Sequence, residues 1–186
     1  MIVYQQAVLI YDLTNEFCNK NMNPIKDRRT IEQMIQAGRS GKQNIVEASL
    51  EKSLKINIKL TGVARASFGE LLEDYADFLR VRGLPIWDRN DPRVWKIRNA
   101  YKTNRSNGSN KSNVTYRSYM VTPEYFANLM ITMISTENYL LDQMLRSLEA
   151  KFIREGGYSE NLTKKRLAYR SNWTNKPNRS NFKMTN

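Results

Sequence analysis

Apolar residues recur every three or four positions along four long stretches of this chain, and this spacing restricts the folds that it can adopt. It places the apolar side chains on one face of a helix, whereas a half-buried strand would alternate apolar and polar residues. The last stretch admits either Glu137 or Tyr139 at one position of this face. In the first stretch the apolar face comprises Val3, Ala7, Ile10, Tyr11, Thr14, Phe17 and Cys18; the other stretches run through residues 31–49, 54–79 and 126–152.

Turn and capping residues separate these stretches. Asn23 and Pro24 are a typical helix start, in which Asn is the N-cap and Pro is the first helical residue. Ser53 is a candidate cap for the third helix, unless the chain only bends there. Gly83 marks the end of the third helix, and Thr122 and Pro123 the start of the last. Short connections favour antiparallel neighbours, so we expect an all-α, up-down four-helix bundle.

The segment between the third and fourth helices, at about residues 84–121, has a different character. A short helix is expected from Pro92 to about Tyr101, followed by a mobile loop at residues 104–113, which is rich in Asn and Ser. After Gly156 and Gly157 the chain continues as a basic extension. The expected organisation is a bundle at residues 1–157, with this insertion, and a partly ordered extension at residues 158–186.

Net charge is the strongest compositional indication of function. The chain carries 30 basic and 18 acidic residues, a formal charge of +12, and its last 36 residues hold nine basic residues against two acidic ones. Such a surplus favours polyanionic partners such as RNA or DNA. The extension interleaves these cations with aromatic side chains that can stack on unpaired bases. The predicted nucleic-acid-binding residues are Lys42, Lys164, Lys165, Arg166, Tyr169, Arg170 and Trp173.

Two structural alternatives stand beside that hypothesis. The aromatic residues of the extension could instead pack on the bundle or on a neighbouring copy. On the second and third helices, charged residues are expected to form structural ion pairs, with the two arginines facing the carboxylates. These residues are Arg39, Glu47, Arg65, Glu70 and Glu73.

The sequence argues against catalysis. It contains no histidine, which is the commonest general acid or base and the usual activator of Ser and Cys nucleophiles. The residues from Gly38 to Lys42 resemble part of a phosphate-binding loop, but Gln36 and Gln43 occupy two of its required positions. Glu70, Glu73, Asp74 and Asp77 share one helix face, so a carboxylate–metal enzyme is a third hypothesis. We nevertheless expect no metal and no cofactor.

The single cysteine, Cys18, follows Phe17 on an apolar face, so we expect a buried thiol and a reducing compartment. The N-terminus lacks the features of a signal peptide, and no apolar run is long enough to span a bilayer. The expected location is the cytoplasm, without membrane association.

Three segments resemble a known family. QMIQAGRSGKQNIVEA at residues 33–48 and GVARASFGELLE at residues 62–73 resemble the second and third helices of the 23S ribosomal RNA intervening-sequence proteins. Ala48 stands where that family usually has glycine. FIREGGYSENLTKKR at residues 152–166 resembles the extension of its "four helix bundle suffix" subgroup. The resemblance implies a small bacterial four-helix bundle that forms a homo-oligomer, in some cases a pentamer.

The accessory protein of diversity-generating retroelements is similar in fold to that family, and it binds nucleic acid and a reverse transcriptase. The resemblance therefore adds a reverse transcriptase as a candidate partner. Our first hypothesis is an oligomeric, nucleic-acid-associated scaffold or accessory protein that is not an enzyme. The alternative is a protein–protein adaptor that binds no nucleic acid.

Overall fold

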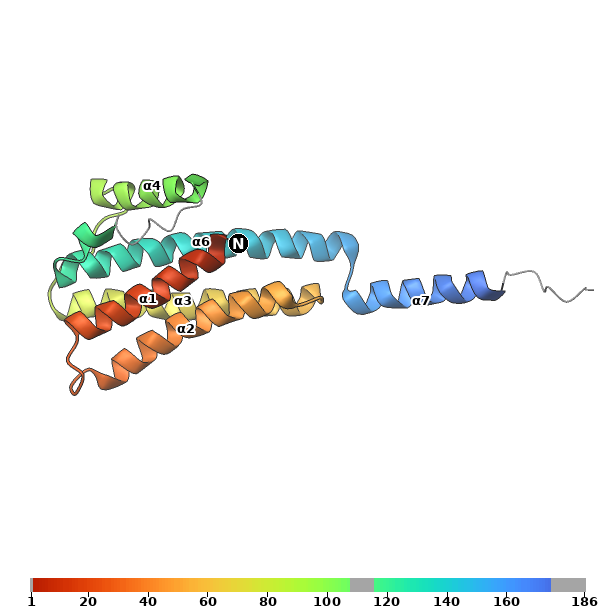
Figure 1. Cartoon of the computed structure of the whole chain (residues 1–186), viewed down its shortest axis with the longest axis horizontal. Coiled ribbons are helices and arrows are strands. Elements are labelled where there is room, and N and C mark those ends of the chain that lie inside the picture. Colours follow the sequence, from red (N-terminus) through yellow and green to blue (C-terminus); the bar gives the residue numbers. More distant parts are fainter. Residues whose placement is uncertain (1, 108–115, 175–186) are drawn as a thin grey trace, which may run out of the picture.

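The computed structural model describes residues 2–107 and 116–174, and these are helical except for short connections. Figure 1 shows the long helices of the bundle gathered together and the last helix projecting from one end. The expected all-α class is confirmed. The helices are α1 (Ile2–Asn21), α2 (Arg28–Leu50), α3 (Leu54–Val81), α4 (Pro92–Asn107), α6 (Pro123–Glu155) and α7 (Tyr158–Thr174), with a 3-10 turn, η1, at Arg117–Tyr119.

We call α1, α2, α3 and α6 the four-helix core. Helix α1 contacts α2 and α6, and α3 also contacts α2 and α6, so that the contacts close a ring. Helix α4 and the turn η1 contact α6 from outside this ring. Each core helix therefore has two neighbours against which to bury its apolar face.

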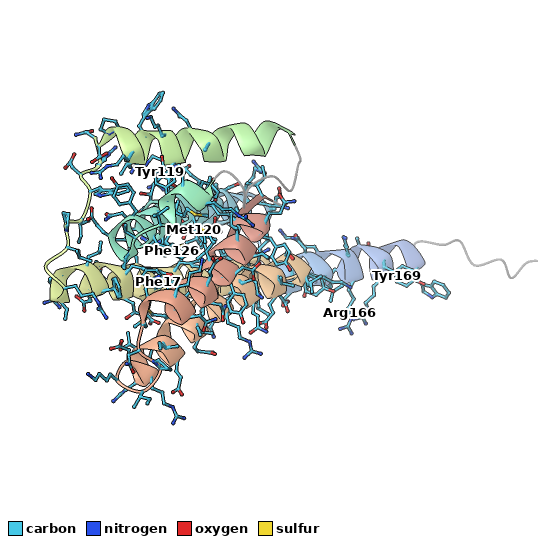
Figure 2. The ribbon with its side chains drawn as sticks, turned by 60° about the vertical axis from the view of Figure 1, so that its left-hand side comes forward. Phe17, Tyr119, Met120, Phe126, Arg166 and Tyr169 are labelled. Atoms are coloured by element: carbon cyan, nitrogen blue, oxygen red, sulfur yellow. The ribbon has the colours of Figure 1, made fainter. Side chains whose placement is uncertain are left out.

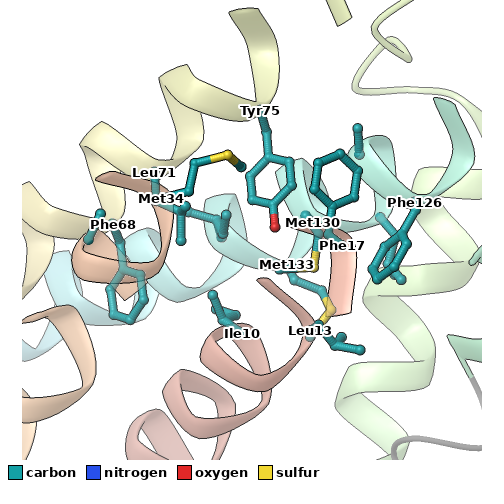
Figure 3. Packing of buried hydrophobic residues seen from close by; sticks show 14 of the residues in the cluster. Ile10, Leu13, Phe17, Met34, Phe68, Leu71, Tyr75, Phe126, Met130 and Met133 are labelled. Atoms are coloured by element: carbon teal, nitrogen blue, oxygen red, sulfur yellow. The ribbon is translucent and has the colours of Figure 1, made fainter. Parts of the chain in front are cut away.

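Aromatic and aliphatic side chains fill the interior of the core (Figure 3). The Phe17 ring lies edge-on to Tyr75, Phe78 and Phe126, with centroid separations of 4.9, 4.8 and 5.2 Å. The Tyr75 hydroxyl donates a hydrogen bond to Thr14 Oγ1 at 3.1 Å, which satisfies a buried polar group. Such edge-to-face contacts join helices α1, α3 and α6 at one point.

The small residues of α2 allow a close approach. A Cβ atom at Gly41 would lie 2.7 Å from two atoms of the Phe68 ring, so the ring of α3 occupies the space of a side chain. At Gly38 the nearest atoms belong to Tyr11 and Leu71, at 3.6 and 3.7 Å. Glycine is thus required at position 41 because the Phe68 ring of α3 packs directly against it.

Two predicted helix boundaries are confirmed. Gly83 has a φ of +64° directly after α3, and the Leu84 N–H bonds the Leu79 carbonyl at 2.9 Å, so the glycine terminates the helix in a left-handed conformation. Thr122 Oγ1 accepts a hydrogen bond from the Tyr125 N–H at 3.2 Å and caps α6 ahead of Pro123.

The predicted start of the second helix is wrong. Helix α2 begins at Arg28, and Asn23 closes a turn instead of capping a helix. Its Oδ1 accepts the N–H groups of Ile25 and Lys26 at 2.9 and 3.0 Å. Asn side chains compete for local backbone donors in this way, which delays the helix. Ser53 does occupy the N-cap position of α3, although its side chain makes no capping hydrogen bond.

Helix α4 is longer than expected. It continues to Asn107, so residues 104–107 of the predicted mobile loop are helical. Extending a formed helix costs much less than nucleating one, and a polar segment can therefore follow an apolar turn into the helix. Residues 108–113 of that predicted loop lie outside the described part of the chain.

Candidate nucleic-acid interface

The basic extension forms helix α7, which leaves the end of α6 through two glycines. Gly156 has a φ of +76°, and the Asn161 side-chain amide donates to the Glu155 carbonyl at 3.0 Å. Figures 1 and 2 show α7 directed away from the four-helix core. No described helix packs along it, so the aromatic residues of α7 do not pack on the bundle, which was one of the structural alternatives; packing on a neighbouring copy stays a separate alternative.

One face of α7 carries apolar and aromatic side chains. Tyr158, Leu162, Tyr169 and Trp173 stand four or seven positions apart, so they follow one side of the helix, and all four are exposed. The Tyr169 and Trp173 rings lie 6.4 Å apart with planes inclined at 31°. This arrangement presents two neighbouring aromatic surfaces to solvent.

Cations accompany this face. Lys165 falls between Leu162 and Tyr169 on the same side of the helix, and Arg166 follows at its border. Arg170 lies at a flanking position and Lys164 on the opposite side of the helix, and all four cations are exposed. Figure 2 shows Arg166 and Tyr169 projecting outward from α7. Six of the seven predicted binding residues therefore belong to one projecting helix. We call five of them, Lys165, Arg166, Tyr169, Arg170 and Trp173, together with Tyr158 and Leu162, the α7 stripe, which excludes Lys164.

Lys42 is the exception among the predicted binding residues. Its Nζ lies 4.0 Å from the centroid of the Tyr11 ring, and its side chain is half-buried between α2 and α1. An ammonium over a ring face is attracted by the ring quadrupole. This contact gives Lys42 a role in packing α1 against α2, and it is not part of the α7 stripe.

The predicted ion pairs are only partly found. Arg65 does form an ion pair, but its Nε donates to Asp142 Oδ1 at 3.0 Å, across to α6. Arg65 faces α6 because its neighbours Ala64 and Phe68 turn inward. In the described part of the chain, no ion pair involves the other four predicted residues, which are exposed: Arg39, Glu47, Glu70 and Glu73.

The acidic face of α3 borders an open groove between α2 and α3. Glu70 and Asp74 line it together with Arg29 and Glu32 of α2. Partial burial, together with the neighbouring charges of Asp77 and Glu70, raises the pKa of Asp74. Within residues 2–107 and 116–174, no three Cys, Asp or Glu side chains form a group suited to holding a metal ion.

The cysteine prediction is confirmed as far as burial is concerned. Cys18 is 1% exposed, and burial, with a smaller contribution from the charge of Asp74, raises the pKa of its thiol to about 12. A thiol with such a pKa is protonated at neutral pH and a poor nucleophile.

Glu137 is a buried carboxyl; the apolar spacing alone could not decide whether Glu137 or Tyr139 faces the core. It is fully buried, whereas Tyr139, the other candidate for that face, is 62% exposed. Among the described residues, neither carboxyl oxygen of Glu137 has a hydrogen-bond partner, and burial raises its pKa well above the usual value. Gln6, also buried, donates through Nε2 to the Met133 carbonyl at 3.1 Å, one turn before Glu137 in α6. The core thus contains a polar region where α1 meets α6.

None of the described helices combines the length and the apolar character needed to cross a bilayer. Comparison with known proteins yields no match to any family model, to any curated protein or to any solved structure.

Proposed function

We propose that this protein is a non-enzymatic, homo-oligomeric scaffold or accessory protein that binds single-stranded nucleic acid through the α7 stripe. The proposal includes an up-down four-helix bundle formed by α1, α2, α3 and α6, of the kind to which the 23S ribosomal RNA intervening-sequence resemblance points. The observation that carries it is the exposure of the whole α7 stripe on a helix that the core does not cover.

The chemistry of the stripe suits a single strand better than a duplex. Lysine and arginine side chains neutralise phosphates and release counterions, which supplies affinity without reading sequence. Tyr169 and Trp173 offer ring faces on which unpaired bases stack. Helix α7 carries four basic residues against one acidic residue, Glu160, so its charge is complementary to a phosphate backbone.

Oligomerisation would strengthen this weak, generic contact. One α7 helix offers few phosphate contacts, but a symmetric ring presents several copies to one strand. Once one copy has bound, the others act at a high effective concentration, and overall affinity rises without any new contact. A reverse transcriptase partner belongs to this proposal through the family resemblance alone, and a cytoplasmic location through the sequence features described above.

Salt dependence tests the electrostatic part of the proposal. We expect fluorescence anisotropy with a labelled oligo(dT) or oligo(rU) to show binding at low salt that weakens steeply as salt increases. Replacing Lys165, Arg166 and Arg170 together by Gln should weaken binding and reduce the slope of log K against log[salt] by about 2, because each single-strand phosphate contact contributes about 0.7.

A matched control separates local contact from net charge. Lys52, Lys55 and Lys59 are exposed at or near the start of α3, and replacing them by Gln removes the same three charges. This control should bind almost as the unaltered protein does. Equal losses in both triple variants would mean that only the overall charge matters, and α7 would not be the interface.

An adaptor role without nucleic acid is the second candidate. Leu50 at the end of α2 and Ile153 near the end of α6 are exposed large apolar side chains, at 77% and 84%. Side chains of this kind are common in protein–protein contacts. A stable oligomer by light scattering that binds neither oligonucleotide at any salt concentration would favour this role.

A further inference from the structure

The connection between α3 and α4 is held rigidly against α6. Trp87 is 7% exposed; its backbone N–H donates to Asn128 Oδ1 at 2.8 Å, and its indole Nε1 donates to Glu124 Oε1 at 3.1 Å. The Arg93 guanidinium lies over the Trp87 ring, 3.9 Å from its centroid. These contacts fix the position of the first turn of α4.

Helix α4 then turns one face inward and another outward. Val94 and Ile97 are 4% and 1% exposed and face the core, whereas Trp95 between them is 65% exposed. Arg98 stands one turn after Trp95 on the same side of the helix. A tryptophan usually buries most of its large apolar surface, so an exposed tryptophan on a fixed helix is a candidate contact for a ligand.

Trp95 and Arg98 line an open hollow of about 500 Å³ on the protein surface. Its other lining residues are Arg89, Asn90 and Pro92. The hollow therefore combines one indole face, two guanidinium groups and one carboxamide. No side chain that lines it carries a negative charge.

Both arginines of the hollow are available for a ligand. Neither Arg89 nor Arg98 forms an ion pair within the described part of the chain. The nearby carboxylates make other contacts: Asp91 pairs with Arg93 at 2.7 Å, and Asp88 Oδ1 accepts the Asn90 N–H at 2.8 Å. Residues 88–98 hold four basic and two acidic side chains, which leaves a charge of +2.

We propose that this hollow is a second contact site for single-stranded nucleic acid, in which one base stacks on Trp95 while Arg89 and Arg98 bind the adjacent phosphates. The proposal rests on the proposed function and extends it to a site far from α7. Guanidinium groups bind phosphate oxygens through paired hydrogen bonds, and base stacking on an indole tolerates any base.

The distance between the hollow and α7 determines how long a strand must be to contact both sites. Helix α4 lies near the start of α6, and α7 begins just beyond the end of α6 (Figure 1). A 33-residue helix is about 50 Å long, so the two sites of one chain are separated by roughly that distance. A long strand can engage both sites, whereas a short one can engage either site but not both.

Tryptophan fluorescence gives a direct test. The chain has three tryptophans, and Trp87 is buried. In a Trp173→Phe background, Trp95 is therefore the exposed indole, and oligo(dT) or oligo(rU) at low salt should quench it by stacking. The same background with Trp95→Phe should lose the quenching while keeping an aromatic surface at position 95.

Affinity measurements complete the test. Trp95→Ala should weaken the binding of a long oligonucleotide about fivefold to a hundredfold, the range expected for one lost stacking contact. Arg89→Gln with Arg98→Gln should reduce the salt slope by about 1.4. Lys55→Gln with Lys59→Gln removes equal charge from α3 and should change the slope little. An unchanged thermal midpoint in Trp95→Ala would show that the loss is not one of folding.

The outcomes distinguish this inference from the function on which it rests. If Trp95→Ala and the double arginine variant bind like the parent while the α7 triple variant does not, the hollow is no contact site and the α7 proposal stands. If the α7 triple variant binds normally and the Trp95 variant does not, the hollow stands without α7. If the unaltered protein binds neither oligonucleotide at low salt, both proposals fail.

Discussion

The four-helix core and α7 both carry large apolar side chains on their helices, but only the core helices pack against neighbouring helices in the described part of the chain. Leu71 in α3 is fully buried, whereas Leu167 in α7 is 59% exposed. Phe17 contacts three other aromatic rings, whereas Tyr169 has one ring neighbour on its own helix. The same residue types therefore stabilise the fold in one region and remain available for binding in the other.

This contrast indicates how an exposed apolar stripe should be interpreted. In the core, the apolar faces of the helices are buried against one another, and the charged residues lie outside. In α7 three of the four cations lie on or beside the face that carries the aromatic side chains, as Lys165 does between Leu162 and Tyr169. A face with cations inside it suits a partner that offers both flat apolar surfaces and negative charge, as nucleic acid does.

The largest effect should come from truncating a core leucine. Leu71→Ala should lower the free energy of unfolding by about 2–5 kcal/mol, because it leaves a cavity among α1, α2 and α3. Urea unfolding followed by circular dichroism measures this loss. Leu71→Met, which conserves volume, should cost less than about 1.5 kcal/mol. A small loss in Leu71→Ala would mean that the core is loosely packed, and the contrast with α7 would weaken.

Glu137 is a buried ionisable side chain within the mostly apolar core, so its protonation state affects stability. Since its pKa is raised in the folded chain, the folded state holds this proton more tightly than the unfolded state does. Stability should therefore be highest below the unfolded pKa of about 4.3 and fall as pH rises above it, by at most about 1.4 kcal/mol per pH unit, until the folded pKa is passed.

The absence of histidine makes this effect measurable. No side chain with an ordinary pKa between 5 and 8 is present in the chain. The pKa of Asp74 is also raised, so the difference between the unaltered protein and Glu137→Gln isolates the contribution of Glu137 to a decline in stability over that range. Glu137→Gln should flatten the decline and raise the urea midpoint at pH 8 more than at pH 5. Glu149→Gln, exposed on the same helix, should follow the unaltered protein. Parallel pH profiles for all three proteins would show that Glu137 is not protonated in the fold.

Gly41 tests how tightly two core helices meet. A Cβ at position 41 would overlap the Phe68 ring, so Gly41→Ala should lower stability by about 1 kcal/mol, the balance of an overpacking cost of about 1–3 and a helix-propensity gain of about 1. Gly62 of α3 has no atom within 4 Å of its Cβ position, and Gly62→Ala should stabilise the protein instead. Stabilisation in both variants would mean that α2 and α3 can separate at little cost.

The sequence predicted the features that local rules determine. Apolar spacing located the helices of the core, and Gly83 and Thr122 ended and began helices for reasons contained in a few neighbouring residues. The composition of residues 158–170 likewise identified the cations of α7. What the composition could not show is that no other described helix packs along α7, because local composition does not determine which parts of the chain meet.

Features that depend on distant residues were missed. Arg65 pairs with Asp142, which is 77 positions away in the sequence, and no spacing rule selects it over the nearer carboxylates. The exposure of Trp95 depends on how Trp87 and Arg93 fix the first turn of α4, which no local spacing reveals. Glu137 was undecided because a carboxyl at an apolar position is expected to face solvent.

The smallest effect should come from the leucine of α7. Leu167→Ala removes the same atoms as Leu71→Ala, but from an exposed site on a helix that packs on no other described helix, and alanine is an excellent helix former. The urea midpoint should therefore change by an amount equivalent to less than about 0.5 kcal/mol. Measuring it at two protein concentrations sharpens the comparison, because only contacts between copies make stability depend on concentration. A loss comparable to that of Leu71→Ala, growing with concentration, would show that Leu167 is buried against a second copy, and α7 would then belong with the core as a packing element.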